Sequence, residues 1–297
     1  MLGVVNLDKP VGPTSHDMVG LMRRLSGTRR IGHAGTLDPL ASGVLPILVG
    51  VATRLSEELT GGRKGYDAVI RLGLRSATDD EEGPLEPGDD PLPTVNAVAA
   101  ELANLVGTFE QRPPAFSARK LAGRIAHRAA RAGEPLDLPA RTVTVDAVRL
   151  LETEAGDGWL DVRIDLRCGP GTYVRSIARD LGERLGCGGY LHALRRTEAA
   201  GLRIEDAITP ERLGALAGAG RLAEAMVPIA DLLPLPRVQL DPAEADRFVH
   251  GSLVQLQPDR AAEGRMAVFG AHELLGVGTL RGGQLQPDKV LAPQAVG

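Results

Sequence analysis

Three polar side chains that could handle a substrate stand close together between His33 and Asp38. His33, Thr36 and Asp38 lie within six residues, and the glycines among them can adopt positive φ angles and bring the backbone close to a ligand. The next stretch, residues 43–50, is almost entirely apolar and predicts a buried strand that would anchor the loop on a rigid scaffold. The pattern is typical of a substrate-handling loop that carries one carboxylate.

The same residues also have structural interpretations. Asp38 followed by Pro39 is an ordinary helix start, with the aspartate as N-cap and the proline at the first helical position. An isolated histidine such as His33 is more often a structural hydrogen-bonding group than a catalytic one. Spacing alone therefore leaves both roles open for each residue.

Hydrophobic periodicity predicts the elements that would position this loop. Ser15 is expected to cap a helix that ends at Gly27, and Thr94 to begin another. Arg175 is expected at a strand-to-helix junction, where functional side chains are common. Expected strands cover residues 3–7, 43–50, 64–74, 142–153 and 159–168, and further helices cover residues 52–59, roughly 120–132, and 174–185.

The charge of the chain is segregated along the sequence. The formal net charge is -4, whereas proteins that bind nucleic acid usually carry a cationic surplus. However, residues 112–131 contain six Lys or Arg and no acidic residue, while residues 79–90 contain seven acidic residues and no basic one. A local positive surface can therefore coexist with an acidic whole, and RNA is not excluded.

Cysteine content and the terminal sequence predict a cytoplasmic protein. Cys168 and Cys187 are the only cysteines, without a CxxC pattern or a histidine cluster, which argues against a disulfide framework or a zinc site. The first residues, MLGVVNLDKP, do not have the form of a signal peptide. No apolar run approaches the roughly 20 residues that span a bilayer, so no membrane association is expected.

Residues 32–46, GHAGTLDPLASGVLP, resemble the signature of the TruB family of pseudouridine synthases, which convert the T-loop uridine of tRNA to pseudouridine. Further motifs of that family follow in order: LDKP at 7–10, KGY at 64–66, RPP at 112–114, GTYVR at 171–175 and LRR at 194–196. Together they span about two thirds of the chain, where a single short motif would be only a hypothesis.

The resemblance implies three catalytic residues. Asp38 is the essential carboxylate, Arg175 pairs with it and keeps it ionised, and Tyr66 stacks on the target base and takes part in the final proton transfer. Without the resemblance, a strand tyrosine such as Tyr66 would be expected only to pack or to form a cross-strand pair.

The resemblance also implies contacts with the RNA substrate. His33 would stack in the space left by a flipped base, Leu194 would form an apolar wall, and Tyr173 would support Arg175. Asp80 matches a family carboxylate near the active site. The full expected set of substrate-binding residues is His33, Lys9, Lys64, Asp80, Tyr173 and Leu194, and the expected RNA-binding residues of the basic helix are Arg119, Lys120, Arg124 and Arg128.

Pseudouridine formation breaks the N1–C1′ glycosidic bond, turns the detached uracil and joins its C5 to C1′. It needs no redox change, nucleoside triphosphate or metal, and the chain has no P-loop, dinucleotide fingerprint or metal-ligand cluster, so no cofactor and no metal are expected. Positive charge develops on the ribose, and one ionised carboxylate can stabilise it. The sequence leaves open whether Asp38 attacks C1′ or takes a proton from the sugar.

Three other functions remain as alternatives. The first is a tRNA-binding or folding factor without catalysis, against which intact Asp38, Tyr66 and Arg175 argue. The second is the guide-dependent catalytic subunit of archaeal and eukaryotic ribonucleoproteins, and the LDKP motif so near the start favours a guide-free enzyme instead. The third is an N-glycosidase, which would release free uracil.

The expected fold class is α+β, with a mixed, mainly antiparallel sheet of the pseudouridine synthase type and flanking helices. Residues 1–233 are expected to form the catalytic domain. Residues 234–297, rich in Pro and Gly with short predicted strands, are expected to form a small β-rich, PUA-like RNA-binding domain. The expected partner is the T arm of tRNA, and a monomer is expected.

Overall fold

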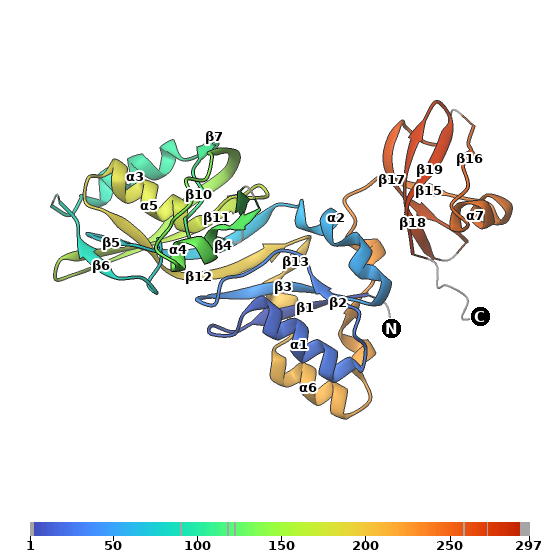
Figure 1. Ribbon diagram of the computed structural model, residues 1–297, viewed down its shortest axis with the longest axis horizontal. Coiled ribbons are helices and arrows are strands. Elements are labelled where there is room, and N and C mark those ends of the chain that lie inside the picture. Colours follow the sequence, from blue (N-terminus) through green and yellow to red (C-terminus); the bar gives the residue numbers. More distant parts are fainter. Residues whose placement is uncertain are drawn as a thin grey trace.

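The computed structural model describes residues 3–89, 91–117, 119–121, 123–257, 259–271 and 273–291. Within these ranges a ten-stranded sheet forms the body of the protein (Figure 1). Its main path runs β14-β1-β3-β12-β4-β11-β10-β7, with β2 paired to β3 and β13 paired to β12. The strands are β1 (Gly3–Lys9), β2 (Ile31–His33), β3 (Ala41–Val49), β4 (Lys64–Leu72), β7 (Gly107–Gln111), β10 (Arg141–Gly156), β11 (Trp159–Cys168), β12 (Gly189–Ala199), β13 (Leu202–Arg203) and β14 (Met226–Val227).

The junction between β3 and β12 joins the two halves of this sheet. These strands run parallel, with Leu194 opposite Ala41, while every other strand pair of the sheet in the described residues is antiparallel. Gly43 makes the junction possible, because its φ is +101° and a Cβ there would lie 2.2 Å from the carbonyl oxygen of Arg196. The mixed, mainly antiparallel α+β architecture expected from the sequence is confirmed.

Helices cover the two halves separately (Figure 1). α1 (Ser15–Ser26) and α6 (Pro210–Gly218) pack on the half that contains β1 and β3, and α3 (Val95–Asn104) and α5 (Val174–Arg184) pack on the half that contains β4, β11 and β10. α5 approaches β12 closely because Gly182 meets Gly189, where an added Cβ would lie 2.1 Å from a backbone nitrogen. α2 (Ser56–Thr60) follows a 3-10 turn at Gly50–Leu55.

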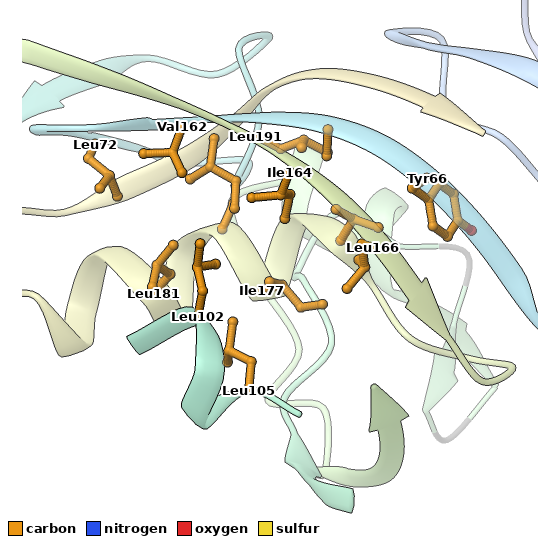
Figure 2. Close-up of a cluster of buried hydrophobic side chains, with 14 of the residues drawn as sticks. Tyr66, Leu72, Leu102, Leu105, Val162, Ile164, Leu166, Ile177, Leu181 and Leu191 are labelled. Carbon is orange, nitrogen blue, oxygen red and sulfur yellow. The ribbon is translucent and has the colours of Figure 1, made fainter. Parts of the chain in front are cut away.

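One apolar cluster fixes α5 on the sheet (Figure 2). The alternation predicted for β11 is confirmed, because its even-numbered apolar residues from Leu160 to Leu166 are buried while the residues between them are more exposed. Ile177 and Leu181 of α5 face these side chains, and α3 closes the cluster from below (Figure 2). Tyr66 lies at the end of this cluster, so the packing that holds the sheet also positions a predicted catalytic residue.

Two local predictions were wrong. The basic segment is not one helix over residues 120–132: it forms a hairpin, β8 (Lys120–Leu121) and β9 (Arg124–Ile125), before the short α4 (Ala126–Arg131). Gly123, with φ at +80°, turns the chain there. The cap of α1 is Thr14 rather than Ser15, because Thr14 forms a capping box with Asp17.

The C-terminal unit is a separate five-stranded sheet in the order β15-β17-β18-β19-β16 (Figure 1). It includes α7 (Pro242–Val249), a helix not expected from the short predicted strands of this region. Its strands are β15 (Arg237–Gln239), β16 (Val254–Gln255), β17 (Gly264–Phe269), β18 (Leu274–Arg281) and β19 (Gln284–Val290), and a further hairpin of the body joins β5 (Leu74–Ser76) to β6 (Leu85–Pro87).

The C-terminal sheet contacts the body through α2. Glu58 of α2 has its carboxylate buried and pairs with Arg265, and Lys289 pairs with Glu57 at 2.7 Å. Apolar side chains of both units form one cluster around Leu59. None of the helices in the described ranges is both long and apolar enough to cross a bilayer.

Candidate active site

A cavity of about 700 Å³ opens where the 33–38 loop meets α2, β4, β12 and the start of α5. Seven of the nine residues predicted to act on the substrate line it, although they come from distant parts of the chain. These seven are His33, Asp38, Lys64, Tyr66, Tyr173, Arg175 and Leu194. Among the described residues, no group of three or more His, Cys, Asp or Glu side chains is arranged to hold a metal ion.

Arg175, in the cavity wall, forms ion pairs with two carboxylates: Asp38, which lines the cavity, and Asp80, which lies behind the wall. Arg175 Nη2 lies 2.9 Å from Asp38 Oδ2, and Arg175 Nη1 lies 3.1 Å from Asp80 Oδ2. The side chains of Arg175 and Asp80 are only 7% and 4% exposed, whereas that of Asp38 is 40% exposed. The buried pair is therefore fixed by its surroundings, and Asp38 presents the accessible carboxylate to the cavity.

Asp80 is held by the turn that carries it. Thr78 Oγ1 donates to Asp80 Oδ1 at 2.5 Å, and the backbone N–H of Glu82 donates to the same oxygen. The preceding residue, Asp79, has φ at +62°, a conformation that Asp and Asn tolerate better than most residues. Asp79 pairs at 3.0 Å with Arg179, one turn after Arg175 on α5. Two consecutive carboxylates thus fasten this turn to two arginines of one helix.

The position of Arg175 follows from how α5 begins. Tyr173 is the N-cap, and the side chain of Gln111 bonds both its N–H and its carbonyl, at 2.9 and 3.1 Å. An arginine in the first turn faces the positive end of the helix dipole, which is unfavourable unless anions lie nearby. Asp38 and Asp80 supply those anions, so the local sequence of α5 depends on carboxylates from two other segments.

Tyr66 stands on β4 and is 6% exposed. Burial raises the pKa of its phenol to about 12, while the positive charge of Arg196, its partner where β12 pairs with β4, acts to lower that pKa. Arg196 of β12 lines the cavity but is 1% exposed, and it donates to backbone carbonyls of Gly35 and Val44 at 3.0 and 2.7 Å. Arg196 belongs to the LRR motif at 194–196, but no role was predicted for it.

Ser15, at the start of α1, fixes the loop that carries Asp38. Ser15 Oγ donates to the carbonyl of Leu37 at 2.9 Å and accepts from the N–H of Leu37 at 2.8 Å. The hydroxyl expected to cap α1 therefore holds the loop next to Asp38. The sequence pattern could not predict this hydrogen bond, because the bond depends on how α1 packs against β3.

Lys9, predicted to bind substrate, is not among the residues that line the cavity. It is fully buried, and its amine donates to the carbonyls of Pro10 and Pro13 at 2.8 and 2.7 Å, with Pro39 more distant at 3.4 Å. Burial lowers the pKa of Lys9 to about 8. Lys9 therefore ties the turn after β1 to the residue that follows Asp38.

Two basic groups line the cavity with lowered pKa values. Burial, and then the charge of Arg196, lower the pKa of His33, and its buried Nδ1 has no hydrogen-bond partner among the described residues. Burial lowers the pKa of Lys64 as well, and its amine donates to the carbonyls of Thr60 and Gly62 at the end of α2. Lys64 thus links the cavity wall to the helix that the C-terminal sheet contacts.

The predicted RNA-binding residues lie outside the cavity wall. Arg119 precedes β8, Arg124 begins β9 and pairs with Glu134, and Arg128 belongs to α4. The side chain of Lys120 lies outside the part of the chain that the structure describes. This hairpin continues from Ser117, which does line the cavity, so these basic residues follow directly from the site.

Comparison with known families defines the class of protein. Residues 23–174 match the TruB family pseudouridylate synthase N-terminal domain, residues 175–234 match the tRNA pseudouridylate synthase B C-terminal domain, and residues 236–291 match the Pseudouridine synthase II TruB C-terminal domain. The fold and the cavity thus belong to a pseudouridine synthase, an isomerase.

Within that class the chain belongs to the TruB family. It is 39% identical to tRNA pseudouridine synthase B of Ralstonia pickettii, over 97% of this chain and 94% of that protein. It is 42% identical to tRNA pseudouridine synthase B of Acaryochloris marina, over 99% and 100%. The family resemblance drawn from the motifs is confirmed.

Solved structures share the same fold. A chain in the crystal structure of a Cbf5–Nop10–Gar1 complex matches with a TM-score of 0.75 and 27% identity, over 98% of this chain and 85% of that one. A chain in the structure of an H/ACA RNP bound to a substrate RNA containing 2′-deoxyuridine matches with a TM-score of 0.74 and 25% identity, over 99% and 86%.

Proposed function

We propose that this protein converts uridine 55, in the T loop of tRNA, to pseudouridine, and that it needs no guide RNA and no cofactor. The observation that carries the proposal is the half-exposed Asp38 carboxylate, which is ion-paired to a buried arginine inside a cavity lined by Tyr66. The tRNA pseudouridine synthase B relatives, similar over nearly the full length, support tRNA as the substrate.

The chemistry of each step follows from the groups that line the cavity. As the N1–C1′ bond breaks, positive charge develops on the ribose, and the carboxylate of Asp38 stabilises it. Arg175 pairs with this carboxylate and orients it toward the substrate. The bound tRNA closes the cavity to bulk water, so the uracil is retained and its C5 is joined to C1′. Tyr66 stacks on the uracil and accepts the C5 proton, and Leu194 forms an apolar wall beside it.

The rest of the chain binds the tRNA. Flipping a uridine out of a folded loop costs a few kcal/mol, and His33 fills the vacated space. Residues 1–233 form the catalytic domain, and residues 234–297 add a second RNA-binding surface to a monomeric enzyme. The hairpin and α4 supply phosphate contacts from Arg119, Lys120, Arg124 and Arg128.

The test is tritium release from an unmodified tRNA transcript labelled at C5 of its uridines, incubated with protein alone. We expect release by the wild type without free uracil, and none by Asp38→Asn, which keeps the shape of the side chain but removes its charge. A transcript with cytidine at position 55 is the matched control and should release no label. Release from that control would refute the assignment of the position.

Two other outcomes would favour other functions. A guide-dependent activity is the second candidate, because the matched solved structures include an H/ACA RNP. It predicts no release from the bare transcript and release once a guide ribonucleoprotein is assembled. Tight tRNA binding without release under either condition would instead indicate a binding or folding factor, and free uracil as product would indicate an N-glycosidase.

A further inference from the structure

Arg196 is the largest of the fully buried side chains in the described residues, and it lies in the cavity wall. Its Nε donates to the carbonyl of Val44 at 2.7 Å and its Nη2 to that of Gly35 at 3.0 Å, while Thr36 is more distant at 3.4 Å. A single guanidinium thus binds both ends of the loop that carries Asp38. Arg196 also lies directly opposite Tyr66 where β12 pairs with β4, and both residues line the cavity.

The charge of Arg196 has no carboxylate partner among the described residues. By contrast, Arg175 contacts two carboxylates. Arg195, which precedes Arg196 and lies on the opposite face of β12, pairs with Asp8 at 2.8 Å. Burial, and to a smaller extent the charge of Arg196, lower the pKa values of His33, Lys64 and Lys9. The phenol of Tyr66, which faces Arg196 across the two paired strands, is the acidic group that interacts with this charge.

We propose that Arg196 is the positioning residue for Tyr66: it holds the phenol oxygen against the cavity and supplies the positive charge that stabilises the phenolate when Tyr66 exchanges protons with the uracil. This inference rests on the proposed function. A buried cation without a carboxylate is costly, and an arginine retained there gains most when a partner becomes anionic. The same guanidinium holds the loop of Asp38, so both groups keep one geometry relative to the substrate.

The proton balance of the isomerisation fits one acid–base group. The reaction removes a proton from C5 and adds one at N1. Tyr66 gives its proton to the ring nitrogen after the N1–C1′ bond has broken with its electron pair on N1, which leaves a phenolate beside Arg196. When C5 has bonded to C1′, the C5–H bond breaks, its electrons return to the uracil ring, and the phenolate takes the proton. The phenol is restored without any other reactant.

The experiment compares single-turnover rates on tRNA transcripts with protium or deuterium at C5 of the target uridine. Arg196→Lys keeps the charge but not the planar fork, and Arg196→Gln keeps planar N–H donors but not the charge. We expect Arg196→Gln to slow product formation by roughly 100-fold, the lower range for loss of acid–base assistance, and Arg196→Lys to slow it less. Both variants should show a larger C5 isotope effect than the wild type, because C5–H cleavage becomes rate-limiting.

The matched control is Arg195→Lys, an equally conservative change one residue away that faces out of the cavity. It should retain the rate and isotope effect of the wild type. tRNA affinity measured by filter binding should change by less than about threefold in all variants, since the proposed role lies after binding. Thermal unfolding followed by circular dichroism identifies which of the two Arg196 variants folds, and either one carries the test.

The outcomes separate this inference from the proposed function. A folded Arg196 variant that is slow but shows the isotope effect of the wild type would overturn the inference, because Arg196 would then only hold the loop. A variant with the wild-type rate would overturn it as well. A wild-type protein that forms no pseudouridine would refute the proposed function, and the inference with it.

Discussion

Replacing Arg175 with lysine tests the two ion pairs that it forms in the cavity wall. The guanidinium contacts Asp38 and Asp80 through different nitrogens and also donates to the carbonyl of Phe116 at 3.0 Å. A lysine has one nitrogen and no planar fork, so it cannot bond both carboxylates in this geometry. Because Asp80 is almost fully buried, one carboxylate is left without its partner, or Asp38 loses its orientation.

The expected cost can be worked from these contacts. Removing one partner of a buried ion pair costs about 3 to 5 kcal/mol, and the retained positive charge of lysine reduces the loss of folding stability to about 2 kcal/mol. If the Asp38 contact is the one that suffers, about 3 to 4 kcal/mol is lost from the transition state. At about 1.4 kcal/mol per tenfold, turnover falls by roughly two to three orders of magnitude.

Arg179→Lys is the matched control, because Arg179 lies one turn later on α5 and also pairs with two carboxylates. It contacts Asp79 at 3.0 Å and Asp180 at 2.7 Å, away from the cavity lining. We expect it to lower the free energy of urea unfolding by about 1 kcal/mol, as for partly exposed ion pairs, and to leave tritium release within about threefold of the wild type. Near-normal turnover of Arg175→Lys, or equal losses in both variants, would refute the reasoning.

Three further predictions test the scaffold of the site. Gly43→Ala should abolish folding or lower the free energy of unfolding by more than about 3 kcal/mol, because the added Cβ collides with the backbone of Arg196. Gly12→Ala has nearly the same φ but no atom within 4 Å of the added Cβ, so it should lower the free energy of unfolding by only about 1 kcal/mol through backbone strain. Urea unfolding measures both values, and equal losses would exclude a steric cause at Gly43. Burial raises the pKa of Asp79 to about 6, above its value in the unfolded chain, so between these two values the folded state binds more protons than the unfolded state. The free energy of unfolding should therefore fall as the pH rises from about 4 to about 6. Asp79→Asn should flatten this part of the curve of unfolding free energy against pH, and an unchanged slope would contradict the raised pKa of Asp79. His33→Phe should keep single-turnover activity within about tenfold because it preserves stacking, whereas His33→Ala should lose more, and equal activity of the two would exclude stacking.

Local periodicity predicted most of the elements around the site. The alternation of apolar residues along β11 and the apolar stripe of α5 follow the buried face of each element, so the sequence pattern predicts both the element and its buried face. The prediction of a single helix over residues 120–132 was wrong for a related reason. It contains few large apolar residues, so its periodicity carried little information, and the positive φ of Gly123 decided for a hairpin.

The site itself could not be derived from local patterns. Asp38 and Arg175 are far apart in the chain and meet because β3 and β12 pair in parallel, an unusual contact in an otherwise antiparallel sheet. Only the family resemblance joined them in advance. Nothing in the local sequence distinguishes Arg195 from Arg196. Because the two residues lie on opposite faces of one strand, Arg195 pairs with the carboxylate of Asp8, whereas Arg196 lies beside the buried phenol of Tyr66.

The two cavity arginines differ in how their charge is balanced, and the proposed reaction explains the difference. Arg175 with Asp38 and Asp80 carries a net negative charge, and its accessible oxygens belong to Asp38. Arg196, without a carboxylate among the described residues, leaves a net positive charge beside Tyr66. Breaking a glycosidic bond separates charge in the same sense, positive on the sugar and negative on the departing base. A cavity with these two ends stabilises that separation with groups already in position, which is where electrostatic catalysis gains most.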